Sequence, residues 1–421
     1  MTLRLKNFLA EHNLVTRRFF LQVGAAGSVF VPRLAVGVAA DQKDNLLADA
    51  IAKLESMLTR QEDFRDVSRG KPLPHSLSDE KKKEVGLTRE TWKLQVTSDD
   101  ENPTKVRSPL TVEKGTAVDF EQLMSIAKKH AVRFTKVMTC LNIGCPLGNG
   151  VWEGVPLREV IWLARPQRDL RRVYYFGYHN EKPDQMFRSS LPIGRVLEDP
   201  FDLPPVILCY KLNGQWLNSE RGGPVRIVVP EAYGFKSIKW VSNVVLTNLF
   251  HANDTYANGN NDVDSPLKSF AATLSIPKEV AANEPIPVTG YAQVGISGLS
   301  KVQVWIQQKG EKRPEGEKHF ASAPWKDAKI LDPPIDWGGD IENGKIPQNT
   351  WGFELNGDRP KRWPIRLSKV HWASLLPGLP AGEYTFRCRT VDEKGIAQPM
   401  PRPFRKSGHC AIEQIGITVK G

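Results

Sequence analysis

Apolar and polar positions alternate along much of the chain, and helical spacing is confined to a few short stretches. The alternation predicts strands at 90–97, 134–138, 172–178, 206–210 and 234–245. Apolar residues at helical spacing predict helices at 43–60, 119–130 and 155–164. Many short strands with few helices favour an α+β fold over a doubly wound parallel sheet.

The last third of the chain has the strongest alternation, over 287–307 and 382–420. Val302, Val304 and Ile306 fall on one strand face, and Tyr384 begins a similar series through Phe386 and Cys388. This pattern predicts an immunoglobulin-like β-sandwich. The expected organisation is therefore a leader at 1–40, a helix and extended arm at 41–84, an α+β domain at 85–262 and a sandwich at 265–421.

The N-terminus resembles an export signal. A twin arginine, Arg17-Arg18, precedes an apolar run at 19–31, and small residues at 38–40 offer a cleavage site. The run is too short to span a membrane, which needs about 20 apolar residues. We expect export to the periplasm by the twin-arginine route, which carries folded proteins and so favours a cofactor loaded before export.

The formal net charge is +11, but the basic residues are scattered and no nucleic-acid-binding motif occurs, so we expect no nucleic-acid partner. Five cysteines are too few, and odd in number, for a disulfide framework. Cys209 and Cys388 lie in apolar strands and are expected to be buried thiols. No GxGxxG, Walker, HExxH, GxSxG or paired CxxC motif supports the common nucleotide, zinc-protease or hydrolase readings.

Cys140 is the cysteine with the most suggestive surroundings. It ends a predicted strand and is followed by a turn-rich stretch with Cys145 and several glycines. From the residues alone it is a metal ligand, a nucleophile or a buried thiol. Two cations in apolar strands, Arg226 and Lys239, each require an anion, which is either a carboxylate of the chain or a bound phosphate or pterin.

Two motifs resemble the sulfite oxidase family: NGQWLNSERGGPVRIVVPEAYGFKSIKW at 213–240, and VMTC followed by VWEGVPL around Cys140. The resemblance implies a molybdenum–molybdopterin cofactor with the Cys140 thiolate as the molybdenum ligand. It implies that Arg69 and Arg221 gather the anionic substrate and that Tyr256, which borders the pocket, hydrogen-bonds it. It also implies a set of cofactor-binding residues, in which Arg221 and His179 replace the family's histidine and aspartate: Arg221, Arg226, Ser237, Ile238, Lys239 and His179.

The implied activity is oxygen-atom transfer, most simply the oxidation of sulfite, a small oxyanion, to sulfate. No C-x-x-C-H haem motif occurs, so electrons would pass to a separate cytochrome c-type acceptor. The sandwich implies a homodimer. The arginine that the family has shortly after its cysteine is absent from Leu141–Cys145, which leaves another substrate open, such as a sulfoxide that is reduced. A non-catalytic exported binding protein built on the sandwich is the alternative from another class.

Overall fold

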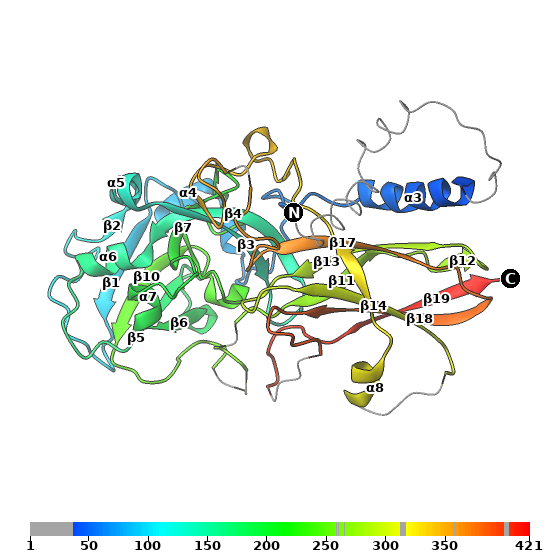
Figure 1. Cartoon of the computed structure of the whole chain (residues 1–421). Helices are drawn as coiled ribbons and strands as arrows, with labels where there is room; N and C mark the ends of the chain where they lie inside the picture. Colours follow the sequence, from blue (N-terminus) through cyan, green and yellow to red (C-terminus); the bar gives the residue numbers. More distant parts are fainter. Residues whose placement is uncertain are drawn as a thin grey trace.

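The structure is a computed structural model that describes residues 37–421 except 258, 260, 265, 312–316, 358 and 400–403. The molecule is elongated, with an α+β unit at one end and a β-sandwich at the other (Figure 1). The predicted twin-arginine motif lies outside the described residues. In the ranges that are described, no helix is long and apolar enough to cross a membrane.

The α+β unit contains two mixed sheets. The first has the order β2-β1-β10-β5-β6, and only β1 and β10 are parallel. Its strands are β1 (Lys93–Ser98), β2 (Val118–Asp119), β5 (Arg172–Gly177), β6 (Arg188–Pro192) and β10 (Val241–Thr247). The second has the order β16-β3-β4-β7-β8, with β9 also paired to β7. Its strands are β3 (Val132–Thr139), β4 (Pro146–Pro156), β7 (Ile207–Leu212), β8 (Gln215–Trp216), β9 (Arg226–Val228) and β16 (Thr350–Trp351).

Short helices connect these strands. They are α4 (Asp79–Glu84), α5 (Phe120–His130), α6 (Leu157–Leu163) and α7 (Ile193–Leu197), with single 3-10 turns η1 (Pro74–Ser76), η2 (Pro183–Gln185) and η3 (Gly234–Lys236). Helix α5 confirms the helix predicted at 119–130. It begins where Asp119 accepts the Gln122 N–H at 2.8 Å and the Gln122 side chain accepts the Asp119 N–H, a reciprocal cap that satisfies two N-terminal donors.

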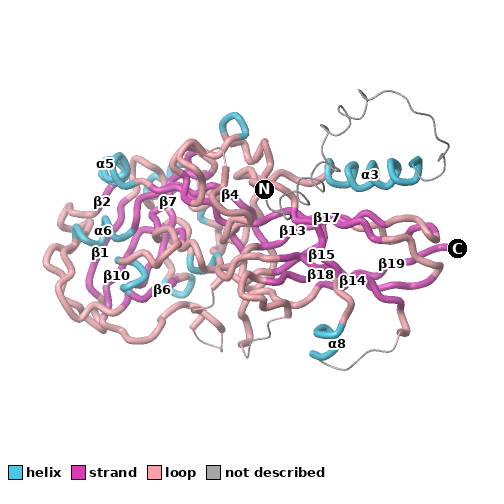
Figure 2. The backbone as a smooth tube through the Cα atoms, in the orientation of Figure 1, coloured by secondary structure: helices cyan, strands magenta, loops and turns pink. Residues whose placement is uncertain are grey.

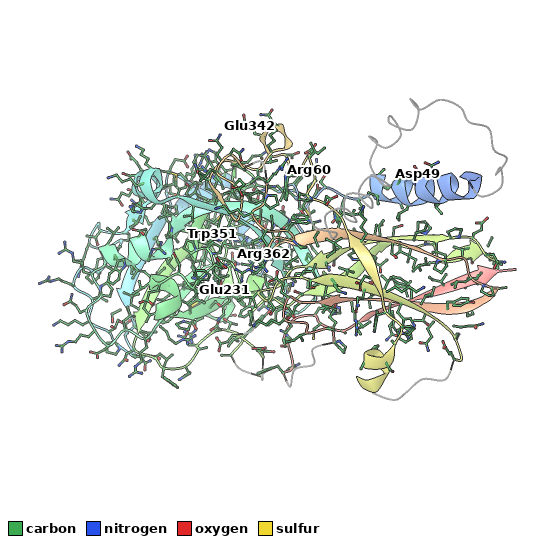
Figure 3. The ribbon with its side chains drawn as sticks, viewed as in Figure 1. Asp49, Arg60, Glu231, Glu342, Trp351 and Arg362 are labelled. Carbon is green, nitrogen blue, oxygen red and sulfur yellow. The ribbon has the colours of Figure 1, made fainter. Side chains whose placement is uncertain are left out.

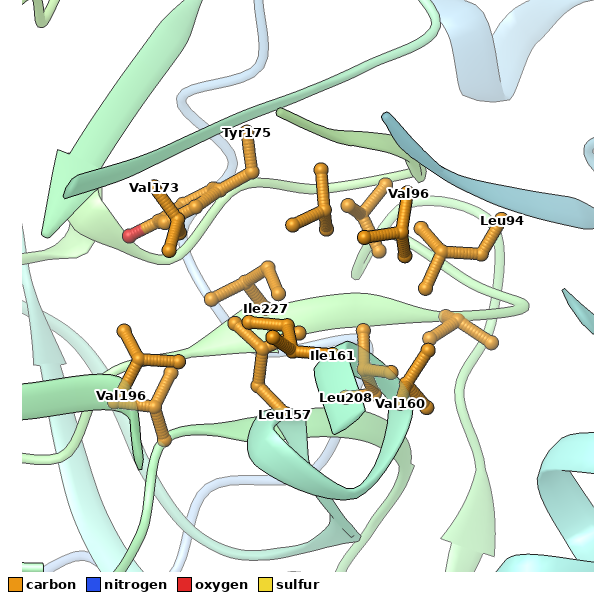
Figure 4. Close-up of a cluster of buried hydrophobic side chains, with 14 of the residues drawn as sticks. Leu94, Val96, Leu157, Val160, Ile161, Val173, Tyr175, Val196, Leu208 and Ile227 are labelled. Carbon is orange, nitrogen blue, oxygen red and sulfur yellow. The ribbon is translucent and has the colours of Figure 1, made fainter. Parts of the chain in front are cut away.

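The main apolar core of this unit lies between the two sheets. Val96 and Tyr175 on the first sheet face Leu208 and Ile227 on the second, and α6 contributes Ile161 (Figure 4). All five side chains are fully buried. Mixed sheets with few helices confirm the α+β class.

The glycine-rich stretch after Cys140, predicted to be a loop, is instead the long strand β4; only residues 141–145 form the turn. The glycines are needed for close packing. A Cβ at Gly148 would lie 2.4 Å from the Phe64 ring, and one at Gly150 would lie 2.4 Å from Leu212. The glycines therefore allow the arm and β7 to pack directly on β4.

The strand predicted across 234–245 begins only at Val241. Residues 234–236 form η3, and Trp240 adopts a left-handed backbone with φ of 52°. Lys239 thus lies in a turn between η3 and β10, where its side chain can face the interior of the α+β unit.

The predicted sandwich is confirmed as two layers, β11-β13-β17-β15 and β15-β14-β18-β19-β12, which share β15 (Figure 2). Val288 and Trp372 of one layer share a core with Val302 and Phe386 of the other. The strands are β11 (Phe270–Ser275), β12 (Glu279–Ala281), β13 (Ile286–Gln293), β14 (Lys301–Gln308), β15 (Lys326–Ile330), β17 (Lys369–Leu376), β18 (Gly382–Val391) and β19 (Glu413–Lys420), and α8 (Glu317–Ser322) follows β14. Cys209 and Cys388 are fully buried, as predicted.

A segment within the sandwich sequence returns to the α+β unit. It contains η4 (Glu342–Gly344) and β16, which pairs in parallel with β3, Thr350 opposite Arg133. Trp351 of β16 and Glu342 of η4 are labelled in Figure 3. Trp337, Ile341 and Phe353 share an apolar cluster with Met57, so this segment joins the two units.

Helix α3 (Gly37–Ala52) lies beside the sandwich, where Asp49 marks it in Figure 3. It contacts β13 and β17. The helix predicted at 43–60 therefore holds only to residue 52. Beyond it the backbone bonds to distant segments, with the Leu58 N–H donating to Trp337 and the Thr59 N–H to Asn149.

Glu55 anchors this segment to the sandwich. Its carboxylate contacts Lys369 and lies 4.0 Å from His371 Nε2. His371 and Lys369 lower the pKa of Glu55 to about 2, against the burial that opposes ionisation. Because this pKa is below the ordinary value, the carboxylate adds stability above pH 4.5 and loses it as the pH falls toward 2.

Glu55→Gln should therefore lower the free energy of unfolding by about 1 kcal/mol at pH 7, since half exposure screens the pair. Thermal unfolding followed by circular dichroism should show a melting temperature about 2 °C lower at pH 7, with the difference shrinking toward pH 3. Glu383→Gln, on an exposed β18 residue, is the matched control. Equal melting temperatures for Glu55→Gln and the parent at pH 7 would contradict the role of Glu55.

Candidate active site

A cavity of about 310 Å³ lies in the α+β unit, between the arm at 64–69, the turn after β3 and the turn after η3. This volume is in the range of small-molecule sites. All nine residues that the sequence singled out line it, although they come from five separate segments: Arg69, Cys140, His179, Arg221, Arg226, Ser237, Ile238, Lys239 and Tyr256. Lining the cavity does not by itself assign a role to any of these residues.

The lining divides into a buried floor and an exposed rim. Arg221, Arg226, Ser237 and Ile238 are each at most 4% exposed and form the floor. The rim consists of exposed side chains from two segments: Arg65, Val67 and Arg69 on the arm, and Asn142 and Ile143 after Cys140. A bound molecule would therefore meet buried cations at the bottom and a mixed, accessible surface at the mouth.

The floor holds two arginines whose donors are only partly used. Arg226 donates to the carbonyls of Arg221 at 2.8 Å and Ser237 at 2.6 Å. Arg221 donates to the Phe64 carbonyl at 2.7 Å and pairs with Glu220. The Nε of each arginine is buried and finds no hydrogen-bond partner among the described residues. Burial lowers the pKa of Arg226 to about 10, so Arg226 remains cationic at neutral pH and can bind an anion; burial also lowers the pKa of Arg221.

Lys239 has a carboxylate partner, which is one of the two alternatives that the sequence left open, the other being a bound phosphate or pterin. Its Nζ donates to Asp66 Oδ1 at 2.8 Å, Ser68 Oγ at 2.6 Å and the Glu220 carbonyl at 2.6 Å. Burial, and then the nearby Arg226, lower the pKa of Lys239 to about 8, so the ammonium is still protonated at pH 7. Arg226, by contrast, has no carboxylate within salt-bridge distance among the residues described.

Cys140 follows directly on β3 and is partly buried at the edge of the floor. The turn is held by a bond from the Gly144 N–H to the Cys140 carbonyl at 3.3 Å. Cys145 lies away from the cavity lining, and its Sγ accepts from Arg65 at 3.5 Å. Where the structure describes the chain, no three His, Cys, Asp or Glu side chains gather as a metal site. Among the described residues, Cys140 is thus the one cysteine that lines the cavity.

The rim joins two residues predicted for the substrate pocket. Arg69 donates to Tyr256 Oη at 2.7 Å, and Asn142 donates to the same oxygen at 2.8 Å. The Arg69 guanidinium also lies 4.7 Å from the centre of the Phe187 ring, a cation–π contact. Because Tyr256 Oη accepts two hydrogen bonds, its own O–H is left to donate in another direction.

His179 lines the cavity as a neutral side chain. Its Nδ1 lies 2.9 Å from the Gly177 carbonyl, which assigns the proton to Nδ1. Burial lowers the pKa of His179, against the Gly177 hydrogen bond that raises it, so the imidazole is uncharged at pH 7. It can therefore offer a hydrogen-bond acceptor rather than a charge.

Sequence reasoning missed four residues of the site: Arg65, Asp66, Ser68 and Asn142. In the segment 65–69 (RDVSR), alternate side chains have different environments in the structure. Asp66 and Ser68 point to Lys239, whereas Arg65, Val67 and Arg69 are exposed at the rim. The partner of Asp66, Lys239, is 173 residues away in the sequence, so no local pattern could indicate it.

Residues 82–254 match the family described as oxidoreductase molybdopterin binding domain. The chain is 27% identical to the sulfite oxidase of Gallus gallus over 223 residues, which are 45% of this chain and 46% of that protein. It is 27% identical to the NADH nitrate reductase of Volvox carteri over 182 residues, 36% of this chain and 21% of that protein.

The chain thus spans less than half the length of these curated relatives. Among solved structures, the sulfane dehydrogenase SoxCD from Paracoccus pantotrophus has the same fold. The TM-score is 0.54 at 17% identity, over 80% of this chain and 79% of that one. The oxidoreductase match argues against the non-catalytic alternative. The match over residues 82–254, together with the similarity to sulfite oxidases and nitrate reductases, supports a molybdopterin-dependent oxidoreductase of the sulfite oxidase family.

Proposed function

We propose that the protein is an exported enzyme that catalyses oxygen-atom transfer, with sulfite oxidised to sulfate and the electrons passed singly to a cytochrome c. The observation that carries the proposal is the cavity itself, which brings a lone thiol, buried cations and an Arg–Tyr pair together from four segments of the chain.

The floor fits a molybdopterin cofactor. The buried Nε groups of Arg221 and Arg226, which have no partner among the described residues, suit a phosphate. Cys140 would hold the molybdenum, since a thiolate is a soft ligand. Arg221, Arg226, Ser237, Ile238 and Lys239 would hold the pterin and its phosphate, with His179 as a neutral hydrogen-bond acceptor. When bound, the cofactor would supply the oxygen-atom transfer.

The rim would gather and orient the substrate. In the described residues no carboxylate lies within salt-bridge distance of Arg65 or Arg69, so neither charge is neutralised before an anion arrives. The O–H of Tyr256 is oriented by its two donors and can hydrogen-bond an oxyanion oxygen.

The second candidate is the reduction of a sulfoxide. Asn142, a neutral amide, contacts Tyr256 where the family's cysteine loop supplies an arginine, and a neutral substrate has less need of that charge. We further propose that the chain passes to the periplasm by the twin-arginine route and forms a homodimer through the sandwich.

Metal analysis of the full chain, purified from a host that makes the cofactor, tests the proposal first. We expect about one molybdenum per chain and sulfite-dependent reduction of cytochrome c. Protein without molybdenum would refute it. Molybdenum-loaded protein that reduces methyl sulfoxides with an artificial donor, and does not oxidise sulfite, would select the second candidate.

Tyr256→Phe should lower kcat/KM for sulfite about 10- to 100-fold, the value of one hydrogen bond to a charged group. The fold should persist, because the ring still packs on Phe187 and Phe235, with ring centres 5.2 and 5.4 Å away. Tyr174→Phe, at a half-buried tyrosine outside the cavity, is the control for steady-state kinetics. An unchanged kcat/KM in Tyr256→Phe would remove Tyr256 from the substrate site.

A further inference from the structure

The rim contains apolar as well as charged side chains, and a purely inorganic substrate does not require the apolar ones. Val67 and Ile143 both line the cavity, and each is 41% exposed. They come from different segments, the arm and the turn after Cys140. An apolar residue from each side of one mouth forms a small apolar surface that only an apolar part of a ligand would cover.

The backbone of the arm fixes where this surface stands relative to charge. In an extended chain, side chains alternate between two sides. Asp66 and Ser68 bond Lys239, whereas Arg65, Val67 and Arg69 are exposed and line the cavity, which is the alternation expected of an extended arm. Val67 therefore lies between Arg65 and Arg69 among the exposed residues of the arm.

Of these two arginines, Arg69 is the one that contacts Tyr256, the residue proposed to hydrogen-bond the substrate. Arg69 bonds Tyr256, which also contacts Asn142, two residues after Cys140. Ile143 is the next residue of that turn. A ligand whose anionic head lies at Arg69 and Tyr256 would thus carry any substituent outward, past Ile143 and Val67 toward Arg65.

We propose that the site accepts organic sulfinates, R–SO₂⁻, as substrates, with R an apolar group held between Val67 and Ile143. This inference rests on the proposed function. A sulfinate is sulfite with one oxygen substituent replaced by carbon, so it keeps the negative charge and the sulfur lone pair that oxygen-atom transfer requires.

The reaction balances with the partners already proposed. The sulfinate and one water give the sulfonate R–SO₃⁻, two protons and two electrons. The sulfur lone pair forms the new S–O bond, the oxygen comes from water, sulfur is oxidised, and the electrons reduce two molecules of ferricytochrome c. No C–S bond breaks.

The rim predicts a preference within this class. Benzenesulfinate should have a higher kcat/KM than methanesulfinate, because its ring covers more apolar surface. The non-reacting product benzenesulfonate should bind more tightly than sulfate, which has the same type of anionic head and no apolar group. Binding is measured by isothermal titration calorimetry on the molybdenum-loaded protein, independently of turnover.

The deciding variant is the double substitution Val67→Ser with Ile143→Ser. The ratio of kcat/KM for benzenesulfinate over sulfite should fall about tenfold, and the ratio of benzenesulfonate to sulfate affinity should fall to a similar extent. Val112→Ser with Ile396→Ser is the matched control: both residues are exposed, 56% and 51%, and neither lines the cavity. This control should leave both ratios unchanged.

The alternative outcomes are separable. Sulfite oxidation with no sulfinate oxidation, and benzenesulfonate binding no tighter than sulfate, would overturn the inference and leave the proposed function standing. Failure of both substrates with molybdenum-loaded protein would overturn both. A raised KM for cytochrome c in the double variant, with the substrate ratio unchanged, would assign the apolar surface to the electron acceptor and overturn the inference.

Discussion

Replacing Cys140 with serine is expected to reduce turnover roughly a thousandfold or more, because a serine hydroxyl is a hard, protonated group and a poor substitute for a thiolate on molybdenum. The fold should persist. The side chain is only partly buried and packs at the edge of the apolar cluster that contains Met138 and Trp152. Steady-state kinetics, molybdenum content and thermal unfolding of the same preparation separate loss of the ligand from loss of structure.

Cys145→Ser is the matched control for this experiment. Cys145 is five residues away and equally half-buried, but it lies outside the cavity lining and contacts Arg65. It should retain most of the turnover. The reverse result, an active Cys140→Ser and an inactive Cys145→Ser, would show that the ligand is Cys145.

The parts of the fold that depend on local pattern could be predicted from the sequence. Helix α5 follows from its apolar spacing and the Asp119 cap, and the Asn213-Gly214 turn between β7 and β8 has the two positive φ angles, 52° and 80°, of a tight hairpin. The alternation of Val302 and Val304 located a sandwich strand, since both are buried in the core between the layers.

The errors arise where tertiary contacts override local signals. Gly148 and Gly150 suggested a loop, but the backbone there is a strand whose glycines make room for Phe64 and Leu212. Residues 53–60 have helical spacing, but the N–H groups of Leu58 and Thr59 bond to the carbonyls of Trp337 and Asn149, distant partners that no local pattern indicates. In both cases the deciding contact is far away in sequence.

The candidate site shows the same division. Motif resemblance identified nine residues that line one cavity in the structure. It could do so because a family motif names residues that are distant in sequence, which a local hydrophobic pattern cannot. Motif resemblance did not identify Asp66, which contributes to the site through its contact with Lys239. That contact bears on what Lys239 does.

Lys239 is the residue at which cofactor binding and support of the arm compete. Its three N–H donors are engaged by Asp66, Ser68 and the Glu220 carbonyl, so it can hold a phosphate only by giving up one of them. Asp66 is the natural one to leave. The approach of a second anion would repel the Asp66 carboxylate. Burial raises the pKa of Asp66, but Lys239 and the hydrogen bonds that Asp66 accepts from Ser68 outweigh burial and lower this pKa to about 2, so Asp66 is charged at pH 7.

Lys239→Met should therefore lower the molybdenum content per chain tenfold or more, since a charge-assisted hydrogen bond contributes about 1.5–3 kcal/mol. Asp66→Asn separates the two roles. It removes the competing charge but keeps an oxygen that can accept from Lys239, so the arm stays in place and molybdenum content should equal or exceed that of the parent. Lys71→Met, at an exposed position of the same arm, controls for loss of a positive charge.

Elemental analysis of the three variants gives a direct answer. Loss of molybdenum in Lys239→Met alone means that the ammonium binds the cofactor. Equal losses in Lys239→Met and Asp66→Asn would mean that Lys239 acts by holding the arm, and full loading in Lys239→Met would exclude it from the cofactor site. Lys239 bonds the arm through its Nζ and also lines the cavity, so only the charge of its partner distinguishes the two functions.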